Sequence, residues 1–320
     1  MAHKALGPAG LAVFQAVRAV HADEPVLVAC SGGADSLALA LAVATLAERT
    51  GCPARAVVVD HGLQAGSAEH SRRVTAQLGT IGLPAEVVAV EVPVGADGPE
   101  AAARTARYSA LTEALTPGER CYLGHTLDDQ AETVLLGLAR GSGLRSLAGM
   151  PPHRGAFVRP LLNMTRASTR AACQEHGWDW WEDPHNTDPR FARVRVRTRV
   201  LPVLEAELGP GVADALARTA DLARADADAL DALARGHATS EPDCAVLVEL
   251  PTALRTRVLR GWLLDQGAGE VNRQHVAAVE ALIIDWHGQR WVEVPGLRII
   301  RRDSRLYAEP SPGEPTGQVS

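Results

Sequence analysis

The 320-residue sequence has few cysteines, no excess of basic charge and no amino-terminal segment apolar enough to cross a membrane. Its five cysteines are scattered and none forms a Cys-x-x-Cys pair, so it carries neither a disulfide framework nor a zinc or iron–sulfur signature. The formal net charge of −6 argues against a globally basic nucleic-acid-binding protein. Residues 1–22 show neither a membrane span nor a signal-peptide pattern, and we therefore expect a cytoplasmic enzyme.

A strand, a loop and a helix follow one another near the amino terminus. Residues 26–30 form a short apolar run typical of a buried parallel strand, and residues 37–47 are rich in alanine and leucine, as helices are. The loop between them consists of Ser31, Gly32, Gly33, Ala34, Asp35 and Ser36. Adjacent glycines let the backbone approach a ligand closely, and the N–H groups at the start of a helix attract anions. The alternative is an ordinary turn in which Ser36 caps the helix.

This loop resembles the pyrophosphate loop, or PP-loop, of the N-type ATP pyrophosphatases, which split ATP into AMP and pyrophosphate. It is not a Walker loop, because no Gly-Lys-Ser or Gly-Lys-Thr ends it. The resemblance implies that the six loop residues hold the phosphates of ATP. It also implies that Asp35 places Mg²⁺, since a carboxylate beside phosphate needs a cation between them.

Further strands and helices alternate along the first part of the chain. The predicted strands are 55–60, 85–92 and 120–124, and the predicted helices are 67–82 and 100–115. This alternation predicts an α/β fold with a doubly wound parallel sheet. Asp60, His61 and His125 follow the ends of two strands, at the sheet edge where such folds bind ligands.

The composition changes after residue 210, which predicts a second domain. We expect a larger domain over residues 1–210, a smaller, mainly helical domain over residues 211–310 and a disordered tail over residues 311–320. The predicted helices of the second domain are 212–235, 253–266 and 271–285. A short antiparallel β meander is predicted from the segments 291–294, 297–301 and 306–308.

Charged residues recur at spacings that suit a binding site. Glu100, Arg104 and Arg107 lie three or four residues apart and so share a helix face, although a solvated ion pair would have the same spacing. Asp128 and Asp129 occupy the first turn of the next predicted helix, where acidic residues also serve as ordinary caps.

Further motifs occur in order between residues 124 and 197. They are Gly124-His125, Asp129-Gln130-Ala131-Glu132-Thr133, Ala139-Arg140-Gly141-Ser142-Gly143, Leu147-Ala148-Gly149-Met150, Arg159-Pro160-Leu161-Leu162 and the segments 182–188 and 191–197. Together with the loop they resemble the tRNA(Ile)-lysidine synthetase family, in order and at family-like spacing. Thr126 and Val194 depart from the family pattern, which usually has His and Asn at these positions.

The resemblance implies an ATP-dependent ligase that joins L-lysine to C2 of the wobble cytidine in the CAU anticodon of tRNA(Ile). The reaction would pass through an adenylated cytidine, release AMP and pyrophosphate, and change codon recognition from AUG to AUA. ATP is then the co-substrate and Mg²⁺ the expected metal ion. The chain matches a short form without the extra C-terminal domain of longer members, and residues 211–310 are expected to bind the tRNA.

The resemblance also assigns roles to individual residues. The expected catalytic residues are Asp35, Asp129 and Arg104, with Asp129 accepting a proton from the lysine amine. The residues expected to bind ATP or pyrophosphate outside the loop are Asp60, His61, His125 and Gly141. The residues expected to bind substrate or tRNA are Arg107, Arg140, Arg190, Arg193, Arg195 and Arg197. In the basic segment 190–199, phosphate contact competes with an ordinary solvated helix face.

Two other functions stay open at this point. A PP-loop tRNA thiolase shares the loop, but it would be expected to need cysteines for a cluster or a persulfide. A nucleotide- or tRNA-binding module without turnover would keep the fold, although an intact loop with Asp35 and Ser36 argues against it. The oligomeric state is also open, with a homodimer among the options.

Overall fold

The computed structural model of the chain describes residues 6–62, 66–91, 99–141, 143–183 and 187–311. The predicted tail therefore lies almost wholly outside the described residues. The chain divides into two compact units, 1–224 and 225–320. Composition placed the boundary at residue 210, whereas the units meet inside helix α10 (Val212–Arg235). The reason is that Arg224 donates hydrogen bonds to the carbonyls of Ala148 and Met150, at 2.6 and 3.0 Å.

The first unit is built on a mostly parallel six-stranded sheet. Its strands, in spatial order, are β3 (Ala85–Ala89), β2 (Ala54–Asp60), β1 (Val26–Ala29), β4 (Arg120–Leu123), β6 (Phe157–Val158) and β5 (His153–Arg154). Of the described strands in this sheet, β5 alone runs antiparallel to its neighbour. The predicted doubly wound sheet is confirmed. The β5–β6 hairpin was not predicted, because two residues per strand are too few for a periodic pattern.

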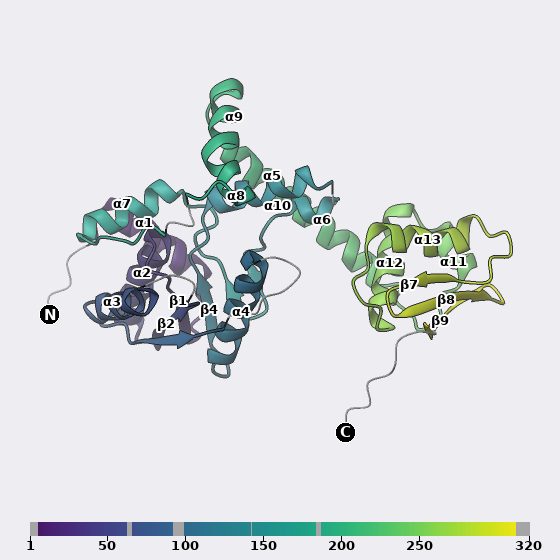
Figure 1. Cartoon of the computed structure of the whole chain (residues 1–320), viewed down its shortest axis with the longest axis horizontal. Helices are drawn as coiled ribbons and strands as arrows, with labels where there is room; N and C mark the ends of the chain where they lie inside the picture. The colour runs from purple at the N-terminus through teal and green to yellow at the C-terminus, as the bar shows by residue number, and fades with distance from the viewer. Residues whose placement is uncertain (1–5, 63–65, 92–98, 142, 184–186, 312–320) are drawn as a thin grey trace. The chain divides into compact units, whose positions relative to one another are not determined.

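Helices cover both faces of this sheet (Figure 1). On one face lie α1 (Pro8–Val20), α2 (Ala34–Thr50), α3 (Ser67–Gly79) and α7 (Arg166–His176), and on the other lies α4 (Pro99–Ala114). The unit also contains α5 (Leu127–Ala139), α6 (Leu144–Leu147), α8 (Ala192–Arg195), the π-helical turn η2 (Val196–Val200) and α9 (Leu201–Leu208). Val26 and Val28 of β1 pack in a core with α1, α2 and α7, whereas Leu27 packs with Leu111 of α4 in a second core. Burial on both faces explains why the strands are continuously apolar.

Strand β1 lies where the strand order reverses. It pairs in parallel with β2 on one side and with β4 on the other. Open α/β sheets bind their ligands outside the carboxyl ends of the strands at this position. The loop after β1, His61 after β2 and His125 after β4 therefore reach the same edge of the sheet.

The second unit combines helices with a small sheet. Its elements are α11 (Cys244–Glu249), α12 (Thr252–Asp265), α13 (Arg273–Ile284), β7 (Val292–Val294), β8 (Leu297–Arg302) and β9 (Arg305–Pro310). The strands are antiparallel in the order β7-β8-β9, which confirms the predicted meander. Leu259 and Leu263 of α12, Leu282 of α13 and Ile299 of β8 form the centre of its core. Across both units, none of the described helices is long and apolar enough to span a bilayer.

Gly137 in α5 lies where this helix touches the segment of α6. A Cβ atom here would sit 2.6 Å from the backbone carbonyl oxygen of Ser146. We expect Gly137→Ala to lower the free energy of unfolding of the first unit by about 1–3 kcal/mol through overpacking, as measured by urea titration. Gly79→Ala, at the end of α3 with nothing within 4 Å of the added carbon, is the control and should be neutral or slightly stabilising. Equal stability of the two variants would contradict the close packing.

Candidate active site

The loop after β1 has a backbone conformation that glycine adopts most easily. Gly32 has a φ of +81°, and a Cβ atom there would lie 2.5 Å from Val74 Cγ2 and 2.7 Å from His70 Cε1. Gly33 is the N-cap of α2 and has no side chain to cap it, so the N–H groups of the first helical turn stay available. Ser36 lies inside this turn and is not the cap, so the alternative of a serine-capped corner is wrong.

The side chain of Ser36 links two backbone groups of the loop by hydrogen bonds. Its hydroxyl accepts a hydrogen bond from the Ser31 N–H at 3.2 Å and donates one to the Gly33 carbonyl at 2.9 Å. The hydroxyl oxygen of Ser31 lies 3.3 Å from the same group. The loop therefore holds its shape through its own contacts, and its two hydroxyls lie together at the start of α2.

Two residues from other segments hold the carbonyl groups of the loop. The Ser31 carbonyl accepts a hydrogen bond from His70 Nε2 at 2.9 Å, and the Gly32 carbonyl accepts one from the Trp181 N–H at 3.0 Å. The rings of His70 and Trp181 are in contact, with their centroids 4.2 Å apart and their planes tilted by 37°. Because its carbonyls are engaged in this way, the loop leaves N–H groups as the polar groups that can meet an anion.

Three carboxylates gather beside the loop, and Arg166 lies among them. Asp35 stands in the first turn of α2, and Asp129 and Glu132 stand three residues apart on α5. Arg166 Nη2 lies 2.8 Å from Asp129 Oδ1 and 3.5 Å from Glu132 Oε1, and Arg166 Nε lies 3.6 Å from Asp35 Oδ2. Thr169, also on α7, donates a hydrogen bond to the other oxygen of Asp35.

Two more arginines reach this cluster from the basic segment. Residues 192–208 form successive helical turns in which η2 is a π-helical turn, a feature frequent at functional sites. Arg197 donates to both oxygens of Glu132, at 2.6 and 3.0 Å, and Arg193 Nε lies 3.9 Å from Glu132 Oε2. Arg195 instead bonds to backbone carbonyls of the preceding segment. The segment is thus amphipathic, and its inner arginines are paired with a carboxylate.

Thr126, where the family usually has histidine, fixes the position of Asp129. It is the N-cap of α5, and its N–H and hydroxyl donate to Asp129 Oδ2 at 2.9 and 3.0 Å. Asp128 accepts the backbone N–H of Arg166 at 2.7 Å and so ties the start of α7 to α5. Asp129 therefore makes the local contact that the capping alternative describes, whereas Asp128 has its partner in another helix.

The carboxyl groups of Asp35 and Asp129 differ in basicity. Burial raises the pKa of the Asp35 carboxyl, and the hydrogen bond from Thr169 offsets this only in part. Burial acts in the same direction on Asp129, but the charge of Arg166, the hydrogen bond from the Thr126 N–H and the charge of Arg197 outweigh it and hold the pKa of the Asp129 carboxyl below its ordinary value. Asp129 is therefore ionised at neutral pH.

A second group of side chains at the sheet edge is basic. Burial lowers the pKa of His125 to about 3, and the charges of Arg159, Arg104 and Arg107 act in the same direction. Burial, followed by the charge of Arg107, also lowers the pKa of His61. Nδ1 of each histidine is buried without a hydrogen-bond partner among the described residues. Both imidazoles are therefore neutral at pH 7 and carry a nitrogen that can bond to a ligand.

The remaining predicted residues have other surroundings. Asp60 ends β2 and accepts a backbone N–H two residues further on, at 3.0 Å. Arg140 is the exposed C-cap of α5, and Gly141 follows it with a φ of +63°. Arg190 forms an ion pair at 2.6 Å with an aspartate two residues earlier. The side chain of Glu100 and part of the motif at 182–188 lie outside the described residues.

Sequence reasoning missed Arg166 and Thr169, and it gave no role to Arg159 or Glu132, although both lie in the quoted motifs. Glu132 had a signal, because it lies three residues after Asp129 and so shares its helix face. Arg166 and Thr169 had none, since only the packing of α7 against its neighbours brings them to the carboxylates.

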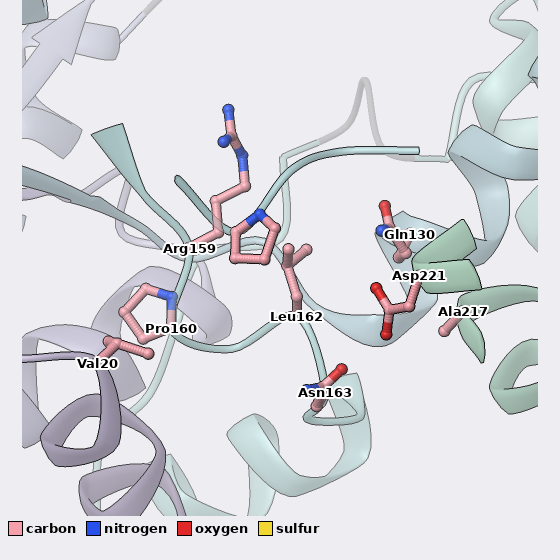
Figure 2. Close-up of a pocket in the computed structure, with 9 residues that line it drawn as sticks. Val20, Gln130, Arg159, Pro160, Leu162, Asn163, Ala217 and Asp221 are labelled. Carbon is pink, nitrogen blue, oxygen red and sulfur yellow. The ribbon is translucent and has the colours of Figure 1, made fainter. Parts of the chain in front are cut away.

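A pocket of about 120 Å³ lies elsewhere in the first unit (Figure 2). Two of its polar side chains have partners: Gln130 bonds to the backbone of Met150, and Asp221 pairs with Arg224. Figure 2 shows the guanidinium of Arg159 pointing away from Asp221, and this group donates to the Tyr108 hydroxyl at 3.2 Å. Neither the loop nor the carboxylate cluster contributes to the lining, so we do not assign the active site to this pocket.

Known proteins match both parts of the chain. A family model described as the PP-loop domain matches residues 11–204, and one described as the TilS substrate binding domain matches residues 243–307. Among solved structures, the U34-tRNA thiolase NcsA from Methanococcus maripaludis, with its [4Fe-4S] cluster, superimposes with a TM-score of 0.55 at 16% identity. The match covers 67% of this chain and 79% of that one. At this identity the likeness concerns the fold alone.

Curated tRNA(Ile)-lysidine synthases are similar over nearly the whole chain. The protein from Leifsonia xyli is 51% identical over 89% of this chain and 90% of its own length, and that from Thermobifida fusca is 52% identical over 91% and 93%. The protein from Salinispora arenicola is 51% identical over 96% and 99%. These matches confirm the family resemblance that the motifs carry. The chain therefore belongs to the tRNA(Ile)-lysidine synthase family.

Proposed function

We propose that the chain is an ATP-dependent ligase that attaches L-lysine to C2 of the wobble cytidine in the CAU anticodon of tRNA(Ile), which changes the codon read from AUG to AUA. Family membership carries this proposal, and a phosphate-binding loop beside three carboxylates at the ligand edge of the sheet supports it. Residues 243–307, which match the substrate-binding model, are proposed to contact the tRNA. The proposed compartment is the cytoplasm.

The proposed reaction has two steps. O2 of the cytosine attacks the α-phosphorus of ATP, an O–P bond forms, and pyrophosphate leaves with the electrons of the broken anhydride bond. The neutral ε-amine of lysine then attacks C2 of the adenylated cytidine, the C2–O2 bond breaks, and AMP leaves with O2. One amine proton must go to a base. The target base has to be unstacked first, as the single-stranded anticodon permits.

The loop is the proposed site for the phosphates of ATP. The N–H groups of the first turn of α2 and the hydroxyls of Ser31 and Ser36 supply donors, and the helix dipole favours negative charge there. The neutral imidazoles of His61 and His125 are assigned to polar atoms of the nucleotide. Asp60 and Gly141 stay in the proposed ATP site on the strength of the motifs alone.

Asp129 is the proposed acceptor for the amine of lysine and for its proton. Its side chain is 12% exposed and that of Asp35 is 23% exposed, so both can meet a substrate. Glu132 is 0% exposed and paired with Arg197, so it cannot contact a substrate and contributes only its negative charge next to Asp129. We propose that Arg193 and Arg197 position Glu132 rather than contact tRNA.

Asp35 is the proposed ligand for Mg²⁺. Its place in the helical turn beside the loop fits this role, because Mg²⁺ is commonly bound by one or two carboxylates together with substrate phosphates. The described residues contain no group of three or more His, Cys, Asp or Glu side chains suited to hold a metal ion, so phosphates would complete the coordination. The ion, when bound, would neutralise phosphate charge.

Arg104 and Arg107 are proposed to bind phosphate of the RNA or the carboxylate of lysine. They come from α4 and share the sheet edge with His61 and His125. The outward-facing arginines are further proposed contacts with the tRNA backbone; they are Arg140, Arg190 and Arg195.

The proposed function predicts that labelled lysine enters a tRNA(Ile) transcript with a CAU anticodon when ATP and Mg²⁺ are present. AMP and pyrophosphate should form together, and tRNA(Met) should stay unlabelled. Asp35→Asn keeps the shape of the side chain without its charge and should abolish turnover. If the protein converts ATP to AMP and pyrophosphate but no labelled lysine enters the tRNA, the PP-loop chemistry stands and lysine or this tRNA is not the substrate. If folded protein neither consumes ATP nor labels the tRNA, a binding module without turnover is favoured.

Arg107→Met is expected to raise the KM for tRNA. Because each phosphate contact releases about one counterion, the slope of log KM against log salt should fall by about 0.7–1. Arg18→Met, on the exposed face of α1, is the matched control and should change neither quantity. An unaltered salt slope in the Arg107 variant would remove this residue from the tRNA site.

His125 is expected to make the stability of the first unit depend on pH. Its pKa is lowered in the folded state from 6.5 to about 3, so the unfolded chain binds the proton first as the pH falls. The contribution of His125 to the free energy of unfolding is therefore fully present above about pH 6.5. It is lost as the pH falls toward about 3, by up to about 1.4 kcal/mol per pH unit. Between pH 7 and about pH 5, urea titration should show a larger loss for the wild type than for His125→Gln. Equal losses would contradict the shift.

A further inference from the structure

Arg166 occupies the position where a substrate cation is needed. Its guanidinium lies 3.6 Å from Asp35 Oδ2 and 2.8 Å from Asp129 Oδ1. Asp129 is the group proposed above to receive the amine of lysine. A guanidinium and an ammonium within about 4 Å of each other repel strongly in a partly buried site. Lysine and Arg166 therefore cannot both hold this position.

The three carboxylates do not depend on Arg166 equally. Glu132 is completely buried and already receives two hydrogen bonds from Arg197, so it keeps its partner if Arg166 leaves. One oxygen of Asp129 and one of Asp35 accept hydrogen bonds from threonine hydroxyls. The other oxygen of each aspartate faces Arg166, and that of Asp129 also lies 3.5 Å from Arg197 Nη2. An exchange of cations would thus act mainly on these two oxygen atoms, because Glu132, 3.5 Å from Arg166, keeps both hydrogen bonds from Arg197.

We propose that Arg166 is an exchangeable counter-ion, which lies between Asp35 and Asp129 in the free protein and moves to the phosphates of ATP when the lysine amine takes its place at Asp129. This inference rests on the proposed function. Asp35 belongs to the helical turn that begins at the loop, so bound phosphates are the nearest new anions for the released side chain. A guanidinium suits both positions, because it stays charged and pairs in bidentate fashion with carboxylate and with phosphate.

The exchange couples the binding of the two substrates. When lysine is bound alone, the nearest anion left for Arg166 is Glu132, which is already paired with Arg197, whereas bound ATP supplies an anion without such a partner. Each substrate therefore increases the affinity for the other, and by thermodynamic linkage the factor is the same in both directions. Direct attraction between the amine and the phosphates would also couple the two, but that coupling would persist without Arg166. Substitution of Arg166 separates the two explanations.

Isothermal titration calorimetry of the full chain can measure the lysine Kd with and without the non-hydrolysable analogue α,β-methylene-ATP. In the wild type the analogue should tighten lysine binding about tenfold. In Arg166→Met, lysine should bind the nucleotide-free protein several-fold more tightly than in the wild type, and the analogue should change its Kd by less than about twofold. Arg170→Met is the matched control on α7, where Arg170 pairs with Glu182 at 3.1 Å, and it should behave as the wild type.

The outcomes separate the exchange from the proposed function. Arg166→Gln, which keeps an N–H donor for Asp129, is the second variant if the methionine variant does not fold. If the analogue tightens lysine binding to a folded Arg166 variant as much as it does in the wild type, the proposed exchange is wrong. Weaker lysine binding by the nucleotide-free variant also overturns it, because that is the effect of a purely structural role. Wild-type protein that binds the analogue but never lysine overturns the proposed function itself.

Discussion

The first unit must neutralise three carboxylates, those of Asp35, Asp129 and Glu132, which lie beside a loop that attracts anions. An unpaired buried carboxylate is costly, so the three carboxylates of the cluster need cations before any substrate arrives. The guanidinium groups that supply this charge come from α7 and from the helical segment 192–208, whereas the carboxylates come from α2 and α5. The ion pairs that neutralise the site therefore also hold four separate segments together.

The loop and the cluster attract opposite charges a few residues apart. The loop offers N–H groups because its carbonyls are bound by His70 and Trp181, and Asp35 follows it within one helical turn. A loop alone would bind a nucleotide, and carboxylates alone would bind an amine. Because Asp35 of the cluster lies in the helical turn that follows the loop, a phosphate and an amine can be brought close to one reacting base.

The fold was largely predictable because its causes are local. Strands buried on both faces are continuously apolar, and Gly32 is required by its own backbone conformation. The cluster was only partly predictable. Thr169 and Asp35 are 134 residues apart, and no periodic pattern links them. The basic segment 190–199 looked uniform in sequence, but helical geometry turns Arg193 and Arg197 toward Glu132 and leaves Arg195 outside.

The electrostatics of the site also limits where the amine proton can go in the proposed reaction. His125 is neutral, but its pKa of about 3 makes it too weak a base to hold a proton at pH 7, and burial makes His61 a weaker base as well. The guanidinium groups are already protonated. Carboxylates are left as the acceptors, and the low pKa of Asp129 depends in part on the charge of Arg166 beside it. Replacement of that guanidinium by a neutral amine would make Asp129 more basic at the step in which it has to accept a proton.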